Sequence, residues 1–440
     1  MRVSLATSPS PPSRQARQGS PPTMRVSVVS LSGRELVSLD AGPSWHLSEV
    51  RALVPEQAAQ AGCRMRVFFG EVELCGSATL AELGVGHGSE LTLLFTPPRV
   101  VTGGPGSSAK LWSAASGDCL VRLQGHQGRV GSAAFSPDGR RAVTASADGT
   151  AKIWAAASGV CLVTLRGHRG AVRSAAFAPD GQHVLTASAD HWAKIWDATS
   201  GECLFTLPGA RAVWSPVVFP DGPSYLVNGS QALTLSEDGT ARLWAAGGGV
   251  CLVTLRGHQE CVWSAAFSPD GRRALTASAD RTAKIWSTAT GKCLFTLQRR
   301  HGVGSAVFSP EGRRVLTAGW GCTVHTATAK IWAAASGECI FTLQGHTKTV
   351  RSAAFSPDGQ HVLTAAEDRT AKIWAAASGD CLFTLQGLTA SWRSAAFSPD
   401  GRHVLTASLD GTAKIWSAAS GACLHTLRGT GGASASFAPS

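Results

Sequence analysis

A short stretch, Thr150-Ala151-Lys152-Ile153-Trp154, recurs along most of this chain and constrains its fold more than any other feature. Eight close copies end in tryptophan, and successive tryptophans lie 42 to 48 residues apart. A spacing this regular indicates an array of similar structural units, each of which buries its core against its neighbours. The copies end at Trp112, Trp154, Trp196, Trp244, Trp286, Trp332, Trp374 and Trp416.

Turn signals divide one repeat into four short stretches. Pro137-Asp138-Gly139 and Asp148-Gly149 are residues that favour tight turns, and the stretches between them are rich in small and β-branched side chains. No segment after Pro105 has a sustained helical period, which disfavours alternating strands and helices. The predicted strands of this repeat are 130–136, 142–146, 151–154 and 161–165.

The array resembles the WD-repeat β-propeller family over residues 99 to 438. The resemblance rests on Gly-His pairs such as Gly125-His126, the Ser-Pro-Asp-Gly turn, an aspartate in the second turn and the closing tryptophan. The aspartate that often follows that tryptophan is present only at Asp197. In that family a His, a Ser or Thr, an Asp and the Trp form a buried hydrogen-bonded network in each blade. The resemblance implies such sets at His126, Thr144 or Ser146, Asp148 and Trp154; at His168, Asp190 and Trp196; at His258, Asp280 and Trp286; and at His346, Asp368 and Trp374.

The two ends of the array complement each other. The array begins with segments that match a second, a third and a fourth strand, whereas residues 433–439 repeat a first-strand sequence. Closure by that C-terminal strand would remove the open sheet edges that promote aggregation. We therefore predict a mainly β fold with a propeller over 100–439 and favour eight blades. The alternative is a seven-bladed ring with a loose terminal unit.

Three repeats depart from the pattern and are expected to be less stable, because a buried network that lacks a partner is destabilised. Gly209-Ala210 replaces Gly-His before Trp244, and Leu388 replaces the histidine before Trp416. The second turn before Trp332 has no aspartate. The irregular segments 220–236 and 320–328 are the natural places for specific function.

Residues 24–95 contain no copy of the repeat and form a second predicted domain. A hairpin (24–29 and 34–39), a helix over 46–60 and three strands (65–69, 72–74 and 91–95) follow one another. This order resembles a ubiquitin-like β-grasp domain, with Val67-Phe68 before Gly70 and a last strand of Leu91-Thr92-Leu93-Leu94. The resemblance implies an exposed hydrophobic patch for partners such as ubiquitin receptors or the proteasome. That patch maps onto Leu31, Val67 and Leu94.

This domain is expected to be a fixed part of the chain and not a conjugated modifier. It runs through the short linker 96–99 into the array, and residues 24–98 contain no lysine. Residues 1–23 are rich in Ser, Pro and Arg, contain no acidic residue and are predicted to be disordered. An organelle transit peptide is disfavoured by the prolines and the weak amphipathic pattern, and a secretory signal is disfavoured because no apolar h-region follows.

One cysteine recurs in every predicted fourth strand, and we interpret it as a small buried hydrophobe repeated by duplication. Neighbouring copies fall on different sheets, and no Cys-x-x-Cys or nearby His pair is present, so neither a disulfide nor a metal site is predicted. Free thiols favour a reducing compartment, which predicts a cytoplasmic location with the nucleus as the alternative. The cysteines are Cys119, Cys161, Cys203, Cys251, Cys293, Cys339, Cys381 and Cys423.

The formal charge of +11 raises nucleic acid as a partner. However, the recurring lysines precede Ile-Trp at equivalent outer positions, so a solvated ring is favoured over a nucleic-acid track. The histidines, aspartates and serines are explained by the blade pattern, and no catalytic motif is present. We therefore predict a protein that is not an enzyme and has no cofactor.

The repeats differ from one another where the first strand begins. Arg and Trp predominate there, and these side chains are enriched in interface hot spots. The leading prediction is a non-enzymatic scaffold whose propeller binds proteins or peptides. The alternatives are a sensor or oligomerisation array and a nucleic-acid-associated propeller. The candidate partner-binding residues are Arg129, Arg173, Trp214, Trp263, Arg351, Trp392 and Arg393.

Overall fold

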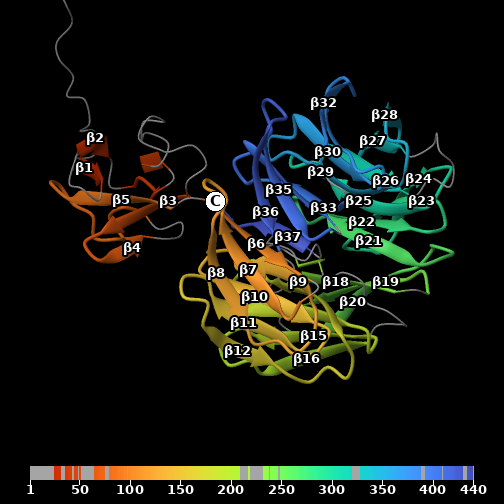
Figure 1. The fold of residues 1–440 in the computed structure, drawn as a ribbon, viewed down its shortest axis with the longest axis horizontal. Coiled ribbons are helices and arrows are strands. Elements are labelled where there is room, and N and C mark those ends of the chain that lie inside the picture. The colour runs from red at the N-terminus through yellow and green to blue at the C-terminus, as the bar shows by residue number, and fades with distance from the viewer. Residues whose placement is uncertain are drawn as a thin grey trace, which may run out of the picture. The chain divides into compact units, whose positions relative to one another are not determined.

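The computed structural model divides the chain into two compact units, Met1–Thr96 and Pro97–Ser440 (Figure 1). In the part of the chain that the structure describes, no helix is long and apolar enough to cross a membrane. The described residues are 24–30, 35–41, 44–47, 49–50, 64–74, 79–96, 98–104, 106–208, 217–218, 231–236, 238–245, 248–319, 328–387, 392–408, 410–429 and 434–439. The tail 1–23 lies outside them.

The first unit is built on a mixed five-stranded sheet with the order β2-β1-β5-β3-β4. Strand β1 forms an antiparallel hairpin with β2 and pairs in parallel with β5, which pairs on its other side with β3. Leu47, Glu49 and Val50 are helical, and the remainder of the helix predicted over 46–60 lies outside the described residues. The strands are β1 (Met24–Ser30), β2 (Glu35–Ala41), β3 (Arg64–Phe69), β4 (Val72–Leu74) and β5 (Glu90–Thr96).

One face of this sheet forms the core of the first unit, and Val67 belongs to it. Val67 is 0% exposed, so the prediction that it lies on an exposed partner-binding face is wrong. The physical reason is its register, because Val67 pairs with Leu93, which is itself buried in the same core. Leu31 lies outside the described residues, and Leu94 lies in β5 with its side chain outside them.

The second unit consists of four-stranded antiparallel sheets, eight of them within the described residues. Each sheet takes four strands that are consecutive in the chain, except one, which has the order β37-β6-β7-β8. The first half of the strands are β6 (Arg99–Gly103), β7 (Ser108–Ser113), β8 (Cys119–Gln124), β9 (Val130–Phe135), β10 (Arg141–Ser146), β11 (Ala151–Ala155), β12 (Cys161–Leu165), β13 (Val172–Phe177), β14 (His183–Ser188), β15 (Trp192–Asp197), β16 (Cys203–Pro208), β17 (Val217–Val218), β18 (Gln231–Leu235), β19 (Ala241–Ala245) and β20 (Val250–Leu255). The others are β21 (Val262–Phe267), β22 (Arg273–Ser278), β23 (Thr282–Ser287), β24 (Cys293–Gln298), β25 (Val303–Phe308), β26 (Arg314–Gly319), β27 (Ala329–Ala333), β28 (Cys339–Leu343), β29 (Val350–Phe355), β30 (His361–Ala366), β31 (Ala371–Ala375), β32 (Cys381–Leu385), β33 (Trp392–Phe397), β34 (His403–Ser408), β35 (Thr412–Ser417), β36 (Cys423–Arg428) and β37 (Ser434–Phe437).

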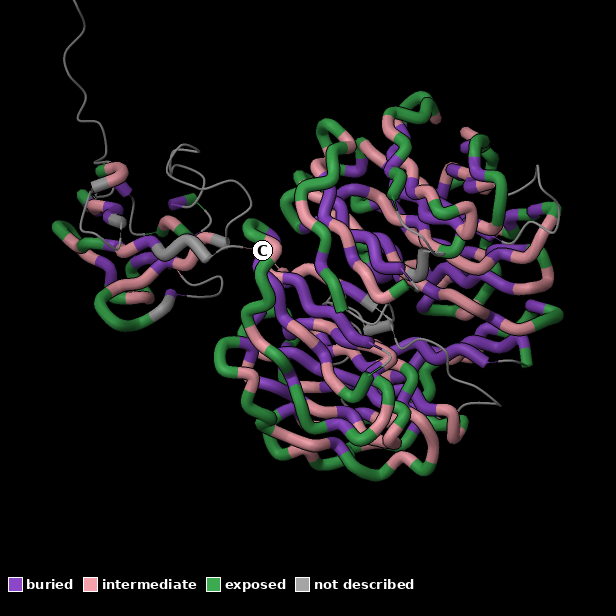
Figure 2. Tube along the Cα trace, viewed as in Figure 1, coloured by how far each residue is buried: buried purple, intermediate pink, exposed green. Residues whose placement is uncertain are grey.

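The hydrophobic core of this unit lies between successive sheets. Trp154 of β11 packs against Val101 and Leu111 of the sheet before it, and the same arrangement recurs around the unit. Second and third strands such as β10 and β11 are therefore buried on both faces, which explains their nearly continuous run of apolar and small residues. The buried parts of the trace coincide with these inner strands, and the exposed parts coincide with the turns (Figure 2).

The first strands of successive sheets contact one another around the unit. Strand β9 contacts β13, and each first strand in turn contacts the next. This series of contacts runs through β17, β21, β25, β29 and β33 to β37, which contacts β9. Strand β37 also pairs antiparallel with β6, with Phe437 opposite Val100. The C-terminal strand thus serves as the first strand of the sheet that contains β6, β7 and β8.

The fourth-strand cysteines are exposed, so the prediction that they are small buried hydrophobes is wrong. The fourth strand is the outermost strand of its sheet and has a hydrogen-bonded neighbour on one side only. A register shift beside the closing tryptophan places the cysteine opposite it, as with Trp154 and Cys161. The cysteine therefore begins an edge strand, where a sheet core no longer covers it.

Candidate functional site

The blade network is clearest in the sheet of β9–β12. The Nε1–H of Trp154 donates to Oγ1 of Thr144 at 2.8 Å, and Nε2 of His126 lies 2.8 Å from the same oxygen. Nδ1 of His126 lies 2.8 Å from Oδ2 of Asp148. The sequence left open whether Thr144 or Ser146 belongs to the network, and the structure shows that Thr144 joins the Trp154 and His126 rings. Ser146 instead accepts from the backbone N–H of Asp148 at 3.1 Å.

This geometry assigns the histidine proton. The ionised carboxylate of Asp148 can only accept a hydrogen bond, which places the donor at Nδ1 of His126 and leaves its Nε2 to accept from the Thr144 hydroxyl. Nδ1 of His126 then carries its own proton and donates it to Asp148. The histidine is neutral in this arrangement, with all of its hydrogen-bonding capacity used.

The same network recurs in three other sheets with almost unchanged dimensions. The glycine before each histidine has a φ near 145°, and an added Cβ would lie 3.3–3.4 Å from the tryptophan ring. The Gly-His pair is therefore a backbone requirement as well as a source of imidazole. The recurring sets are His168, Thr186, Asp190 and Trp196; His258, Thr276, Asp280 and Trp286; and His346, Thr364, Asp368 and Trp374.

Burial lowers the pKa of the His126, His168 and His258 imidazoles below their usual value, outweighing the neighbouring carboxylates. Burial also raises the pKa of the Asp280 carboxyl, but hydrogen bonds from Thr282, Gln259 and His258 reverse this and hold that pKa below its ordinary value. Both shifts favour a folded state with neutral histidine and ionised aspartate.

These shifts predict that stability falls on acidification. Below the ordinary histidine value of 6.5, the unfolded chain takes up protons that the folded chain does not, so unfolding is favoured. Protonation of the aspartates adds to the loss below their ordinary value of 3.8. We expect the urea midpoint to fall between about pH 7.5 and about pH 5.5. The fall should be smaller in His258→Gln, and a midpoint that is constant or rises would contradict this assignment.

The bond between tryptophan and threonine is present in the other four sheets as well. The pairs are Trp112 with Thr102, Trp244 with Thr234, Trp332 with Thr317 and Trp416 with Thr406, at 2.8–2.9 Å. Two of the predicted departures, Gly209-Ala210 and Leu388, lie outside the described residues. The irregular segment 220–236 is described only from residue 231, and 320–327 is not described.

In the sheet of β25–β28 an arginine takes the place of the histidine. Nη1 of Arg299 donates to the carbonyl oxygen of Thr317 at 2.9 Å, and its Nη2 donates to Oγ1 and to the carbonyl oxygen of Thr328. Arg299 is 8% exposed, and burial lowers its pKa to about 10, so it remains charged at neutral pH. Sequence reasoning missed this residue. The signal was the run Gln298-Arg299-Arg300-His301, which interrupts the Gly-His pattern.

The candidate partner-binding residues lie where the first strands begin. Arg173, Trp263 and Arg351 each lie at a register shift between the first and second strands, which is a β-bulge. Arg393 lies at the corresponding shift, but its side chain and that of Trp392 are outside the described residues. Trp214 is also outside them.

A β-bulge redirects the side chain of its extra residue, here at the start of an innermost strand. Arg173 and Arg351 are exposed and Trp263 is half-buried. Arg351 pairs with Glu367, with Nε donating to Oε1 at 2.7 Å. Arg129 is exposed and directly precedes β9. The same strand position around the unit thus presents different side chains from different sheets.

No group of three or more His, Cys, Asp or Glu residues among the described residues is placed to hold a metal ion. The recurring lysines are engaged within their own sheets, since Nζ of Lys152, Lys194, Lys284 and Lys372 donates to a fourth-strand threonine at 2.8–3.0 Å.

The family model described as "WD domain, G-beta repeat" matches six segments that together cover more than half of the chain. The matched residues are 117–155, 159–197, 249–287, 291–326, 337–375 and 379–417. Together with the four-stranded sheets, these matches support the predicted WD-repeat β-propeller. No curated protein sequence matches the chain. Among solved structures, the chain is similar to the computationally designed Ika8 protein, with 28% identity and a TM-score of 0.64 over 74% of this chain and 94% of that one.

Proposed function

The chain belongs to the WD40 repeat family, and from this we propose that it is a non-enzymatic scaffold whose closed propeller of eight blades binds a protein or peptide. WD40 repeat proteins generally mediate protein–protein interactions and are typically not enzymes. The contacts from β9 around to β37, and the pairing of β37 with β6, support closure with eight blades. Exposed thiols in equivalent positions support a reducing location such as the cytoplasm.

One observation carries the binding proposal, namely the different residues at one recurring β-bulge. Three sheets place Arg173, Trp263 and Arg351 there, whereas two others have Gly131 and Gly304. The backbone is thus conserved between sheets while the side chain varies from absent to large. Such variation on a constant frame suits recognition, and Arg and Trp suit interface anchors.

We extend the proposal to the first unit, which we interpret as a ubiquitin-like β-grasp domain that recruits ubiquitin-system machinery. A hairpin, a helical segment and three further strands, with β1 parallel to β5, support this interpretation. Since Val67 is buried, its substitution would damage the core and would not test a binding face. Removal of the unit is the better test.

Affinity capture from a cell lysate tests both parts of the proposal. The full chain is compared with residues 97–440 and with a triple variant, Arg173→Gly, Trp263→Gly and Arg351→Gly, which adopts the glycine that other sheets have at the bulge. We expect the triple variant to lose the proteins that both other forms retain. Ubiquitin receptors or proteasome subunits should be retained only by forms with the first unit.

A matched control changes exposed side chains at the opposite edge of the same sheets. Leu204→Thr, Leu294→Thr and Leu382→Thr alter the fourth strands of these sheets, where the leucines are 39–45% exposed. This control should retain the same proteins as the full chain. Loss in the control but not in the bulge variant would refute the binding face. An unchanged set after removal of the first unit would refute the recruitment role.

A further inference from the structure

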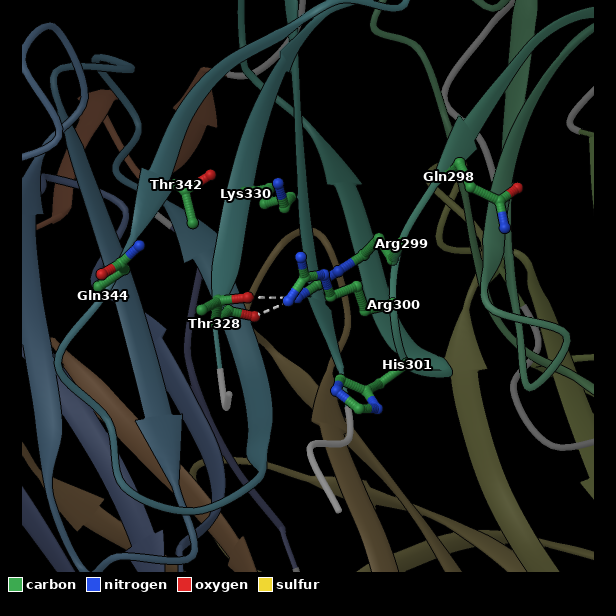
Figure 3. A pocket seen from close by; sticks show the side chains of 8 residues that line it. All are labelled: Gln298, Arg299, Arg300, His301, Thr328, Lys330, Thr342 and Gln344. Atoms are coloured by element: carbon green, nitrogen blue, oxygen red, sulfur yellow. Dashed lines mark hydrogen bonds between the residues drawn. The ribbon is translucent and has the colours of Figure 1, made fainter. Parts of the chain in front are cut away.

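A cavity of about 530 Å³ lies beside the sheet of β25–β28 (Figure 3). Three of its lining residues, Arg299, Arg300 and Lys330, are basic, and His301 adds an imidazole. Thr328 and Thr342 add hydroxyl groups. The lining residues that the structure describes include no carboxylate, so this part of the cavity is rich in hydrogen-bond donors and positive charge.

Arg299 makes this cavity more than a basic surface. Its guanidinium is buried, and its described hydrogen bonds go to neutral oxygens of Thr317 and Thr328. Within the described part of the chain, no carboxylate pairs with Arg299, Arg300 or Lys330. The segment 320–327, which follows β26, contains no Asp or Glu in its sequence. A buried charge without a counter-charge is costly, so an anion in the cavity would be strongly favoured.

The sheet before it provides an internal comparison. A cavity of about 450 Å³ there is lined by Thr282 and Lys284, which correspond by repeat position to Thr328 and Lys330. That cavity also contains Glu260, Asp280 and Arg281, so its acidic and basic side chains balance, whereas the described lining of the Arg299 cavity has arginines and no acid. The same position in two successive sheets is thus balanced in charge in one sheet and positively charged in the next. Two copies of the same fold could carry the same charges at this position, so the difference in charge is a property of the Arg299 cavity itself.

We propose that the Arg299 cavity binds a small molecule that carries two or more phosphate groups. Its volume is within the range of small-molecule sites, and the planar guanidinium of Arg300 matches a phosphate group with two parallel hydrogen bonds, while Arg299, whose Nη atoms are engaged by Thr317 and Thr328, contributes its charge. Lys330 supplies further charge for a second phosphate group. This site is separate from the bulge residues and is independent of the proposed scaffold function.

Isothermal titration calorimetry of the full chain with inorganic tripolyphosphate tests the proposal, and citrate at matched ionic strength serves as the polycarboxylate comparison. We expect saturable one-site binding of tripolyphosphate and weaker binding of citrate. Arg300→Gln and Lys330→Gln should each weaken binding about tenfold, because each removes a charged hydrogen bond. Lys284→Gln, the equivalent change in the cavity that contains carboxylates, should leave binding unchanged.

Arg299 is left intact because it also holds the blade together, whereas Arg300 is exposed and Lys330 is partly exposed. Unchanged urea midpoints in Arg300→Gln and Lys330→Gln will confirm that any loss of binding is local. The proposal is overturned if tripolyphosphate gives no saturable heat or if citrate binds as tightly. It is also overturned if Lys284→Gln weakens binding as much as Lys330→Gln does.

Discussion

Truncation after residue 433 is expected to lower the free energy of unfolding by about 5 kcal/mol, because it removes a paired strand and part of the core. Strand β37 pairs with β6 over residues 434–437, and the N–H of Ala438 donates to the carbonyl oxygen of Arg99 at 2.7 Å. The strand also contacts β9 and β33, so its loss opens the chain of first-strand contacts. Urea denaturation measures the effect.

The truncated chain should also associate with itself. Strand β6 would become an unpaired edge beside the buried residues Val100 and Val101, and such an edge is a template for pairing with another chain. Size-exclusion chromatography should show larger species. The control removes only residues 439–440, which leaves β37 in place, and should behave as the full chain does. A truncated chain that stays monomeric with an unchanged midpoint would show that the ring does not depend on this strand.

Asp280→Ala is expected to lower the free energy of unfolding by about 3 kcal/mol, since it leaves several buried donors without an acceptor. Oδ2 of Asp280 is 2.8 Å from Nδ1 of His258 and accepts from the N–H of Gln259 at 3.0 Å. Oδ1 accepts from the hydroxyl of Thr282 at 2.6 Å. The Asp280 side chain is only 7% exposed, so water cannot easily replace it.

Asp270→Ala is the matched control in the same sheet. Asp270 also accepts from a serine hydroxyl, that of Ser268 at 2.5 Å, and from the N–H of Arg272 at 3.1 Å, but it lies in a turn at the surface. Its loss should cost about 1 kcal/mol, as for an ordinary turn or cap. Chemical denaturation of both variants gives the comparison. Equal losses would mean that the network around Trp286 has no special importance.

Repetition explains why much of the fold was predictable from sequence. Tryptophan spacing and turn residues located the strands to within a residue or two, as with the predicted 161–165 and observed β12 (Cys161–Leu165). The roles of His126, Asp148 and Trp154 followed from the family resemblance, because the same backbone places them together in each copy.

Properties that depend on neighbouring sheets were not predictable. Cys161 looked like a core residue because it is small and recurs, but whether a fourth strand is covered depends on the edge of the sheet and not on its sequence. Val67 was assigned to a surface by resemblance, and its register with Leu93 places it in the core. The sequence showed only that Gly-His is missing at Arg299. The role of Arg299 depends on the positions of Thr317 and Thr328, which accept its hydrogen bonds.

The measurement that tests the central claim most directly is hydrogen–deuterium exchange on the full chain with and without a captured protein. The account predicts new protection in the peptides that begin the first strands, around Arg129, Arg173, Trp263 and Arg351. The fourth strands, such as β12 and β24, should exchange as in the free chain. Protection confined to the fourth strands or to residues 24–96 would contradict the claim that the bulge positions of the propeller bind partners.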